Sequence, residues 1–215
     1  MNKINVGIAG CMGRMGRNLV RAVHLNKDLN FIGGFESSND KNIGKKIGSI
    51  LDLKINRTVS KEKEKIISKS NVVIDFTTPQ STKAVVKIAT KYNTALVIGT
   101  TGLSKEIKKL LNDSSKKIPI FYSANMSIGV NVLFKMAGIL AKTLEEGFDI
   151  EIVEAHHRFK KDAPSGTAVR LAEIVADSLG RDLEKFGIYG RRGISATRDP
   201  KEIGIHTLRA GDIVG

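Results

Sequence analysis

One short segment, residues 153–168, concentrates side chains that could do chemistry. It reads VEAHHRFKKDAPSGTA, with two adjacent histidines, His156 and His157, followed by cations and a Ser-Gly-Thr sequence. The cations are Arg158, Lys160 and Lys161. Ser165 is placed to cap a following helix, whose first N–H groups would then face an anion. Because an imidazole can donate a proton during a reaction, the segment predicts an anion site with a general acid.

Paired histidines also suggest a zinc site. The chain has four histidines: His24, His156, His157 and His206. Neighbouring residues of a strand point to opposite faces, and the histidines lack the spacing typical of metal ligands. We therefore predict no metal site, and the alternative to an anion site is a polar loop with a hydrogen-bonded histidine.

A glycine-rich turn near the N-terminus has the pattern of a nucleotide-binding loop. An expected strand, 4–10, leads into GCMGRMG (residues 10–16), and an amphipathic helix, 16–25, follows. Such glycines allow a tight turn, close approach of a pyrophosphate and close packing of helix on strand. Glu36 closes the next strand, 31–36, where a carboxylate can bind a ribose hydroxyl. The combination predicts a dinucleotide site.

Two residues of this turn refine the prediction. Arg14 would stand in the first helical turn, where a cation opposes the helix dipole, so we expect an anion nearby. Cys11 is interpreted as a small residue of the turn and not as a nucleophile. Both interpretations favour phosphate groups as the ligand of the turn.

Three more polar segments follow expected strands. They are Asp75-Phe76-Thr77, GTTG at 99–102 and SANM at 123–126. Each alone is compatible with ordinary turn chemistry. Ligands of open α/β sheets bind outside the carboxyl ends of the strands, so together the segments predict a binding site for the nicotinamide half of a dinucleotide.

The expected elements alternate between strand and helix. Beyond those above, the expected strands are 71–77, 94–102, 118–125, 149–157 and 204–210, the helices are 81–92, 104–114, 129–144 and 167–179, and 37–50 is a loop. Alternation indicates parallel βαβ units. The fold class is therefore α/β, a doubly wound parallel Rossmann-type sheet with a second, smaller α+β domain. We place the boundary after residue 127, giving a dinucleotide-binding domain, 1–127, and a substrate-binding and oligomerisation domain, 128–215.

Composition limits the function classes. The 215 residues carry a formal net charge of +13, yet only 5% are aromatic. The lysines are interleaved with acidic residues, as on solvated helix faces, so no nucleic-acid partner is predicted. No run of residues is apolar enough for a membrane span, and the single cysteine suits the cytoplasm.

Six segments resemble the 4-hydroxy-tetrahydrodipicolinate reductase (dihydrodipicolinate reductase) family. They are the glycine turn, IDFT at 74–77, VIGTTG at 97–102, SANMSIGVN at 123–131, EAHHRFKKDAPSGTA at 154–168 and RAGDIVG at 209–215. The resemblance runs in order along nearly the whole chain, and the histidine segment is its most specific part. It implies NAD(P)H-dependent reduction of a cyclic dicarboxylic imine in diaminopimelate and lysine biosynthesis, by a homotetramer joined through the sheet of the second domain.

The resemblance also implies roles for single residues. The catalytic pair would be His156, as proton donor, and Lys160. The substrate would be held by His157, Ser165, Gly166 and Thr167. The cofactor, NADH or NADPH, would be held by Gly10, Cys11, Met12, Gly13, Arg14, Met15, Glu36, Gly99, Thr100, Thr101, Ser123, Ala124, Asn125 and Met126.

The sequence departs from the family pattern at three places. Phe159 stands where many members have histidine, so we assign it no catalytic role. Ser37 stands where NADPH-dependent members often have arginine, so we expect NADH to bind at least as well as NADPH. The chain stops at Gly215, before further strands and a helix of the family. We therefore expect an exposed sheet edge at 204–210, a weakened second domain, doubtful tetramer assembly, low activity and aggregation, unless the chain is part of a longer product.

Two other classes of NAD-binding protein are alternatives. A redox-sensing NAD-binding regulator would suit the positive charge, but it needs a DNA-reading helix pair, and no segment outside the βαβ pattern offers one. A short-chain dehydrogenase needs Tyr-x-x-x-Lys. The residues four places after Tyr92, Tyr122 and Tyr189 are Leu96, Met126 and Gly193, which excludes that mechanism.

Overall fold

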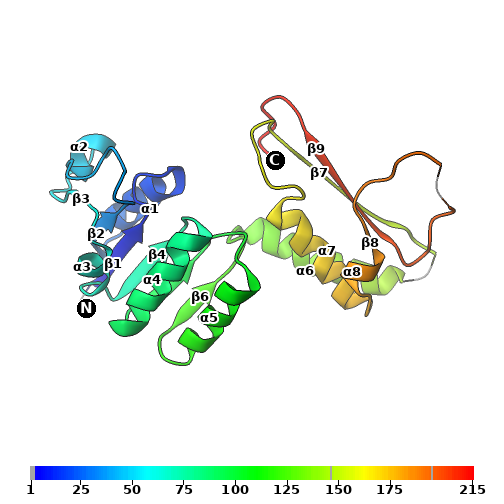
Figure 1. Ribbon diagram of the computed structural model, residues 1–215, viewed down its shortest axis with the longest axis horizontal. Helices are drawn as coiled ribbons and strands as arrows, with labels where there is room; N and C mark the ends of the chain where they lie inside the picture. Colours follow the sequence, from blue (N-terminus) through cyan, green and yellow to red (C-terminus); the bar gives the residue numbers. More distant parts are fainter. Residues whose placement is uncertain (1–2, 146, 195) are drawn as a thin grey trace. The chain divides into compact units, whose positions relative to one another are not determined.

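The computed structural model describes residues 3–145, 147–194 and 196–215. The chain divides into two compact units, Met1–Ala124 and Asn125–Gly215 (Figure 1). The division after Ala124 falls three residues before the boundary that we expected.

The first unit is built on a six-stranded sheet with the order β3-β2-β1-β4-β5-β6. Every neighbouring pair is parallel. The strands are β1 (Ile4–Ala9), β2 (Leu29–Phe35), β3 (Val59–Ser60), β4 (Val72–Asp75), β5 (Ala95–Ile98) and β6 (Ile120–Tyr122). The strand order reverses between β1 and β4, which is where such sheets bind their ligands. The predicted doubly wound parallel sheet is confirmed.

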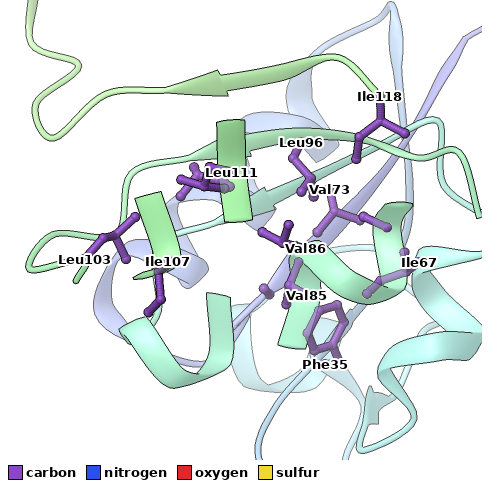
Figure 2. Close-up of a cluster of buried hydrophobic side chains, with 13 residues drawn as sticks. Phe35, Ile67, Val73, Val85, Val86, Leu96, Leu103, Ile107, Leu111 and Ile118 are labelled. Atoms are coloured by element: carbon purple, nitrogen blue, oxygen red, sulfur yellow. The ribbon is translucent and has the colours of Figure 1, made fainter. Parts of the chain in front are cut away.

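Helices cover both faces of this sheet. They are α1 (Arg14–Leu25), α2 (Ile47–Leu51), α3 (Lys63–Ile67), α4 (Pro79–Lys91) and α5 (Lys105–Ser115). Figure 2 shows the core on one face, where Val85 and Val86 of α4 pack with Val73 of β4. Val20 of α1 belongs to a second core, on the other face, with Ile8 of β1. Each fully buried aliphatic side chain contributes about 1.5–3 kcal/mol, so the two cores fix the sheet that carries the loops.

Short elements were missed from the sequence. The segment expected as a loop, 37–50, in fact runs into α2, whose Ile47 and Leu51 are buried in the core. β3 and α3 were not predicted either. Elements of two to five residues are too short to show a hydrophobic period, so only their burial identifies them. α1 also begins at Arg14, two residues earlier than expected.

The second unit contains a small sheet with the order β7-β9-β8, again parallel. Its elements are α6 (Ile128–Leu144), β7 (Ile150–His156), α7 (Gly166–Ser178), α8 (Leu183–Phe186), β8 (Gly187–Ile188) and β9 (Ile203–Arg209). Ala172 and Val175 of α7 pack on Ile152 of β7 and on Ile203 and Ile205 of β9. This core fixes the inner face of β7 and β9 against α7.

The exposed edge expected at 204–210 is covered only at its start, because β8 reaches Gly204 and, within the described residues, no strand pairs with that side of β9 beyond it. β9 is the middle strand, and it pairs with β7 along its whole length, from Ile150↔Ile203 to His156↔Arg209. On its other side β8 pairs with Ile203 and Gly204. A strand of two residues leaves no alternating pattern in a sequence, so this second neighbour could not be predicted.

Candidate active site

The glycine turn lies at the carboxyl end of β1, where the sheet order reverses. Gly10 has a φ of +64°, a conformation that favours glycine. Gly13 is the N-cap of α1, and its N–H donates to the Gly10 carbonyl at 3.1 Å. A Cβ atom on Gly16 would overlap that carbonyl and would lie 2.8 Å from Cys11 Cα. The turn and the first helical turn are therefore packed backbone against backbone.

The start of α1 is suited to an anion. Its N-cap makes no side-chain hydrogen bond and its first turn has no acidic residue, so the first N–H groups are not satisfied by a cap. Arg14 and Met15, the first two residues of the helix, are exposed. Cys11 is fully buried, and burial followed by the charge of Glu36 raises the pKa of its thiol to about 12. Cys11 can thus offer only its backbone to a ligand.

Glu36 lies directly against this turn. Its Oε1 accepts the Met12 N–H at 2.6 Å. Burial raises the pKa of Glu36, while the hydrogen bond from Met12 opposes the change. The half-buried carboxylate is therefore held beside the glycine turn, as a ribose-binding residue requires. A dinucleotide fits these residues, because the start of α1 offers N–H groups without a side-chain cap, the glycines allow close approach and Glu36 adds a carboxylate.

The loops that follow β4 and β5 are joined by hydrogen bonds. Asp75, fully buried, accepts hydrogen bonds from the Thr77 N–H at 3.0 Å and the Thr77 hydroxyl at 2.6 Å. Thr77 N–H also donates to Thr100 Oγ1 at 3.1 Å, and Thr82 Oγ1 lies 2.9 Å from the same atom. The Thr100 hydroxyl is thus engaged in holding the loops. Thr101 beside it is exposed.

Two backbone features complete this edge of the sheet. A Cβ atom on Gly99 would overlap the Phe76 ring, so only glycine lets the loop lie against that side chain. Ser123 N–H donates to the carbonyl of Ile98, the last residue of β5, at 3.1 Å. Ala124, which ends the first unit, is exposed. The segments after β4, β5 and β6 therefore all lie at the carboxyl edge, as the topology requires.

Asn125 and Met126 belong to the second unit. Asn125 Nδ2 donates to Thr167 Oγ1 at 3.2 Å, and its Oδ1 accepts from the Ser127 N–H at 2.9 Å. Met126 is partly exposed. Asn125, predicted to hold cofactor, is therefore bonded directly to Thr167, which was predicted to hold substrate.

The histidine segment begins on β7 and continues into the loop before α7. His156 is the last residue of β7, and its Nδ1 lies 2.5 Å from Glu154 Oε2. His157 follows the strand, and its Nδ1 accepts from the Phe159 N–H at 3.2 Å. Phe159 itself is 74% exposed. Of the two adjacent histidines, His156 is thus the one bonded to a carboxylate.

Glu154, which the sequence analysis missed, is the centre of a buried network. The guanidinium of Arg209 donates to both of its oxygens, each at 2.9 Å. Thr207 Oγ1 and Ser165 N–H donate to Oε1 at 3.1 and 3.0 Å. Burial alone raises the pKa of Glu154, but hydrogen bonds, first from Arg209 and then from His156, lower it to about 2. The carboxylate is therefore ionised at neutral pH. Its i, i+2 spacing to His156 on a strand was the available signal.

α7 begins beside this network. Ser165 is buried, and its Oγ accepts from the Ala168 N–H at 3.2 Å, so it caps the helix as predicted. Gly166 and Thr167 are the first two residues of α7, and the first N–H groups of a helix have no intrahelical acceptor. The N–H groups of these two residues are thus suited to bind an anion, and Ser165 caps the helix beside them.

Lys160 is ion-paired in this state of the protein. Its Nζ lies 2.8 and 2.9 Å from the two carboxylate oxygens of Asp162. Burial raises the pKa of Asp162, but the hydrogen bond from Lys160, a backbone hydrogen bond and the charges of Lys160 and Arg209 together lower it. Arg158 and Lys161 are exposed. The loop between β7 and α7 therefore carries three cations, one of which is paired with Asp162.

Neither a metal cluster nor a membrane span is found in the part of the chain that the structure describes. No group of three or more His, Cys, Asp or Glu residues is arranged to hold a metal ion within residues 3–145, 147–194 and 196–215. Within the same ranges no helix combines the length and the apolar character needed to cross a membrane.

Two family models cover nearly the whole chain. The model described as "Dihydrodipicolinate reductase, N-terminus" matches residues 4–126, and "Dihydrodipicolinate reductase, C-terminus" matches residues 129–215. The chain belongs to the dihydrodipicolinate reductase family. It is therefore an NAD(P)H-dependent oxidoreductase with a nucleotide-binding N-terminal part, and the regulator alternative is set aside.

Individual relatives agree with this membership. A 4-hydroxy-tetrahydrodipicolinate reductase of Laribacter hongkongensis is 42% identical over 215 residues, covering 100% of this chain and 80% of the relative. One from Desulfotalea psychrophila is 48% identical over 209 residues, covering 97% and 78%. Among solved structures, a dipicolinate-bound dihydrodipicolinate reductase from Paenisporosarcina sp. TG-14 superposes with a TM-score of 0.69 at 26% identity, covering 99% of this chain and 80% of that one.

Proposed function

We propose that this chain reduces 4-hydroxy-tetrahydrodipicolinate to tetrahydrodipicolinate with NAD(P)H, in diaminopimelate and lysine biosynthesis. The observation that carries the residue-level proposal is the position of His156. It is hydrogen-bonded to the ionised Glu154, which also binds the N-cap residue of α7. A proton donor and a carboxylate-binding helix start are thus joined by one buried side chain.

The anion site binds the substrate's carboxylates. The N–H groups of Gly166 and Thr167 at the start of α7 receive one carboxylate, and the helix dipole favours its charge. Lys160 and His157 bind the second carboxylate. For this, the Lys160 ammonium leaves its ion pair with Asp162 and pairs with the substrate instead. The dipicolinate bound to the Paenisporosarcina relative is a ring with two carboxylates, which supports this assignment.

His156 supplies the proton. Its Nδ1 is held by Glu154, so Nε2 is the nitrogen that we assign to the substrate; Gly215 lies beside it, since a Cβ atom there would come within 2.7 Å of Nε2, and the substrate would have to take that place. The reaction adds a hydride to one ring carbon and a proton to the neighbouring carbon, and one water leaves from the hydroxylated precursor. A bound nicotinamide supplies the hydride. His156 gives the proton from Nε2 and recovers one from solvent, while Lys160 holds the substrate in place and compensates its negative charge.

The cofactor is held by the glycine turn and the loops after β4, β5 and β6. N–H groups at the start of α1 bind the pyrophosphate, and Glu36 binds the ribose hydroxyls of NADH. A 2′-phosphate would meet the Glu36 carboxylate, and Ser37 adds no positive charge. We therefore propose that NADH binds at least as tightly as NADPH.

Self-association is part of the proposal. On the face of the second sheet opposite α7, Val153 is 64% exposed and Leu208 is 53% exposed. Exposed apolar side chains on neighbouring strands favour an interface between copies, in line with the tetramer that the resemblance implies. We place the enzyme in the cytoplasm, because a single buried thiol, Cys11, suits a reducing compartment.

The test is oxidation of NADH, followed by its ultraviolet absorbance, on adding the condensation product of pyruvate and aspartate semialdehyde. His156→Gln should lower kcat roughly 10²–10⁴-fold and leave the Kd for NADH nearly unchanged. The matched control is His24→Gln, because His24 stands in the last turn of α1, at the opposite end of that helix from the glycine turn. Near-normal turnover of His156→Gln would show that this segment is not part of the active site.

A further inference from the structure

Glu154 has no role in the reaction assigned above, yet it contacts two parts of the proposed site. It is 9% exposed and accepts hydrogen bonds from four residues: His156, Ser165, Thr207 and Arg209. A carboxylate buried to this degree needs partners for all of its charge. The four residues that donate hydrogen bonds to Glu154 therefore indicate the role of its carboxylate.

Strand geometry explains why these partners meet. Glu154 and His156 are two residues apart on β7, so both side chains leave the same face of the strand. The parallel register places Thr207 beside Glu154 and Arg209 beside His156. Arg209 then reaches back to Glu154 with both terminal nitrogens, and such a fork fixes the plane of a carboxylate. Glu154 is thus held rigidly before any ligand arrives.

This rigid carboxylate determines which nitrogen of His156 carries a proton. An ionised carboxylate can only accept hydrogen bonds, and its Oε2 lies 2.5 Å from His156 Nδ1. Nδ1 must therefore carry the hydrogen, and in the neutral ring Nε2 is left as the basic atom. After His156 gives up its proton, the ring is already in the form that can be reprotonated at Nε2.

The same carboxylate fixes the helix that binds the substrate. Its Oε1 accepts the N–H of Ser165, the residue that caps α7. One side chain thereby sets the position of the proton donor relative to the first turn of α7. A displacement of about 1 Å between such groups is enough to lower a rate roughly 10²-fold.

We propose that Glu154, oriented by Arg209, is a positioning residue that keeps His156 in its Nδ1–H form and at a fixed distance from the start of α7. The consequence for turnover rests on the proposed function, because it requires His156 to be the proton donor. The hydrogen bond itself does not depend on that function. A purely structural ion pair would instead stabilise the sheet without controlling the form of the imidazole.

The first measurement is ¹⁵N NMR of the histidine rings in the full chain at about pH 9, where imidazole is neutral. The His156 signal is assigned by its loss in His156→Gln. We expect the Nδ1–H form to predominate in the unmodified chain and the Nε2–H form in Glu154→Gln. Glu151→Gln, on the opposite face of the same strand, should leave the His156 signal unchanged. A predominant Nε2–H form in the unmodified chain would overturn the proposal.

The second measurement is steady-state kinetics. Glu154→Gln should lower kcat by about 10²-fold or more with the substrate KM within about threefold of the parent. Equal kcat in a folded Glu154→Gln protein refutes the positioning role. If the unmodified chain does not turn over this substrate, the proposed function fails. The NMR result still shows whether Glu154 determines which nitrogen of His156 carries the hydrogen.

Folding of the variant needs its own control, because Glu154→Gln leaves the partly buried charge of Arg209 without its counter-charge. The double variant Glu154→Gln/Arg209→Met removes both charges. We expect it to fold, as judged by circular dichroism, with His156 in the Nε2–H form and with the same loss of kcat. A folded double variant with parental kcat contradicts the inference as clearly as the single variant would.

Discussion

The buried Glu154 should make the second unit sensitive to acid, and Glu154→Gln is the perturbation that isolates this effect. The pKa of Glu154 is lowered from an ordinary 4.5 to about 2. Because the folded state prefers the ionised form, its stabilisation is fully present above about pH 4.5 and is lost as the pH falls towards 2. The variant has no group to titrate, so its stability should not show this loss.

The magnitude follows from the pKa difference. At about 1.4 kcal/mol for each pH unit, the change from 4.5 to about 2 corresponds to roughly 3 kcal/mol at pH 7. About 2 kcal/mol of this should disappear between pH 7 and pH 3. The stability difference between the unmodified chain and Glu154→Gln should therefore narrow by that amount. The side chain of Glu154 is only 8% exposed, so salt should have little influence on the result.

Glu151 provides a matched comparison on the same strand. Hydrogen bonds from Arg191, then from His206 and Arg198, lower the pKa of Glu151 to about 2 as well. Its side chain is 35% exposed, however, and exposed ion pairs contribute about 1 kcal/mol or less. Glu151→Gln should therefore cost less than Glu154→Gln, and its cost should shrink at high salt.

The assay is urea unfolding at several pH values with pulsed hydrogen exchange, read by mass spectrometry on peptides that cover β7 and β9. All labelling pulses are given at one pH, so that the intrinsic exchange rates are equal. A stability difference between parent and Glu154→Gln that stays constant from pH 7 to pH 3 would refute the assignment of Glu154 as the ionised centre of the network.

Three further predictions concern both units. Glu36→Gln should stabilise the first unit at pH 7 in thermal unfolding, because the raised pKa of Glu36 means that the folded state disfavours the ionised carboxylate. In calorimetry, the same variant should bind NADH about tenfold or more weakly than the unmodified chain. Gly16→Ala should destabilise the chain by roughly 1–3 kcal/mol in urea unfolding, because its Cβ overlaps the Gly10 carbonyl. Gly13→Ala should cost clearly less, because its Cβ would lie 3.3 Å from the same carbonyl, and equal costs would contradict this packing. Lys160→Ala should raise the substrate KM and lower kcat, each about tenfold or more, and unchanged kinetics would exclude Lys160 from the site.

Much of the first unit was predictable because its signals are local. A buried strand, a glycine turn and a helix occur in sequence at 4–25, and Gly10 and Gly16 are required by backbone geometry within a few residues. The Ser165 cap was predictable for the same reason, since a cap depends only on the residues that follow it. The carboxyl ends of parallel strands meet at one edge, so even the grouping of Asp75, Gly99 and Ser123 followed from the alternation of elements.

What the sequence could not determine is the partner of each side chain across the sheet. The alternation along 203–209 places Thr207 and Arg209 on one face, but the register with β7, Glu154↔Thr207 and His156↔Arg209, depends on how the two strands pack against α7. A shift of one residue would turn Arg209 away from Glu154. β8, with two residues, likewise gains its place as a neighbour of β9 only from the packed core. Local propensity thus determined the long helices, the glycine turn and the Ser165 cap. The network around His156 was decided by tertiary packing, because it joins Glu154 to Arg209, more than fifty positions away.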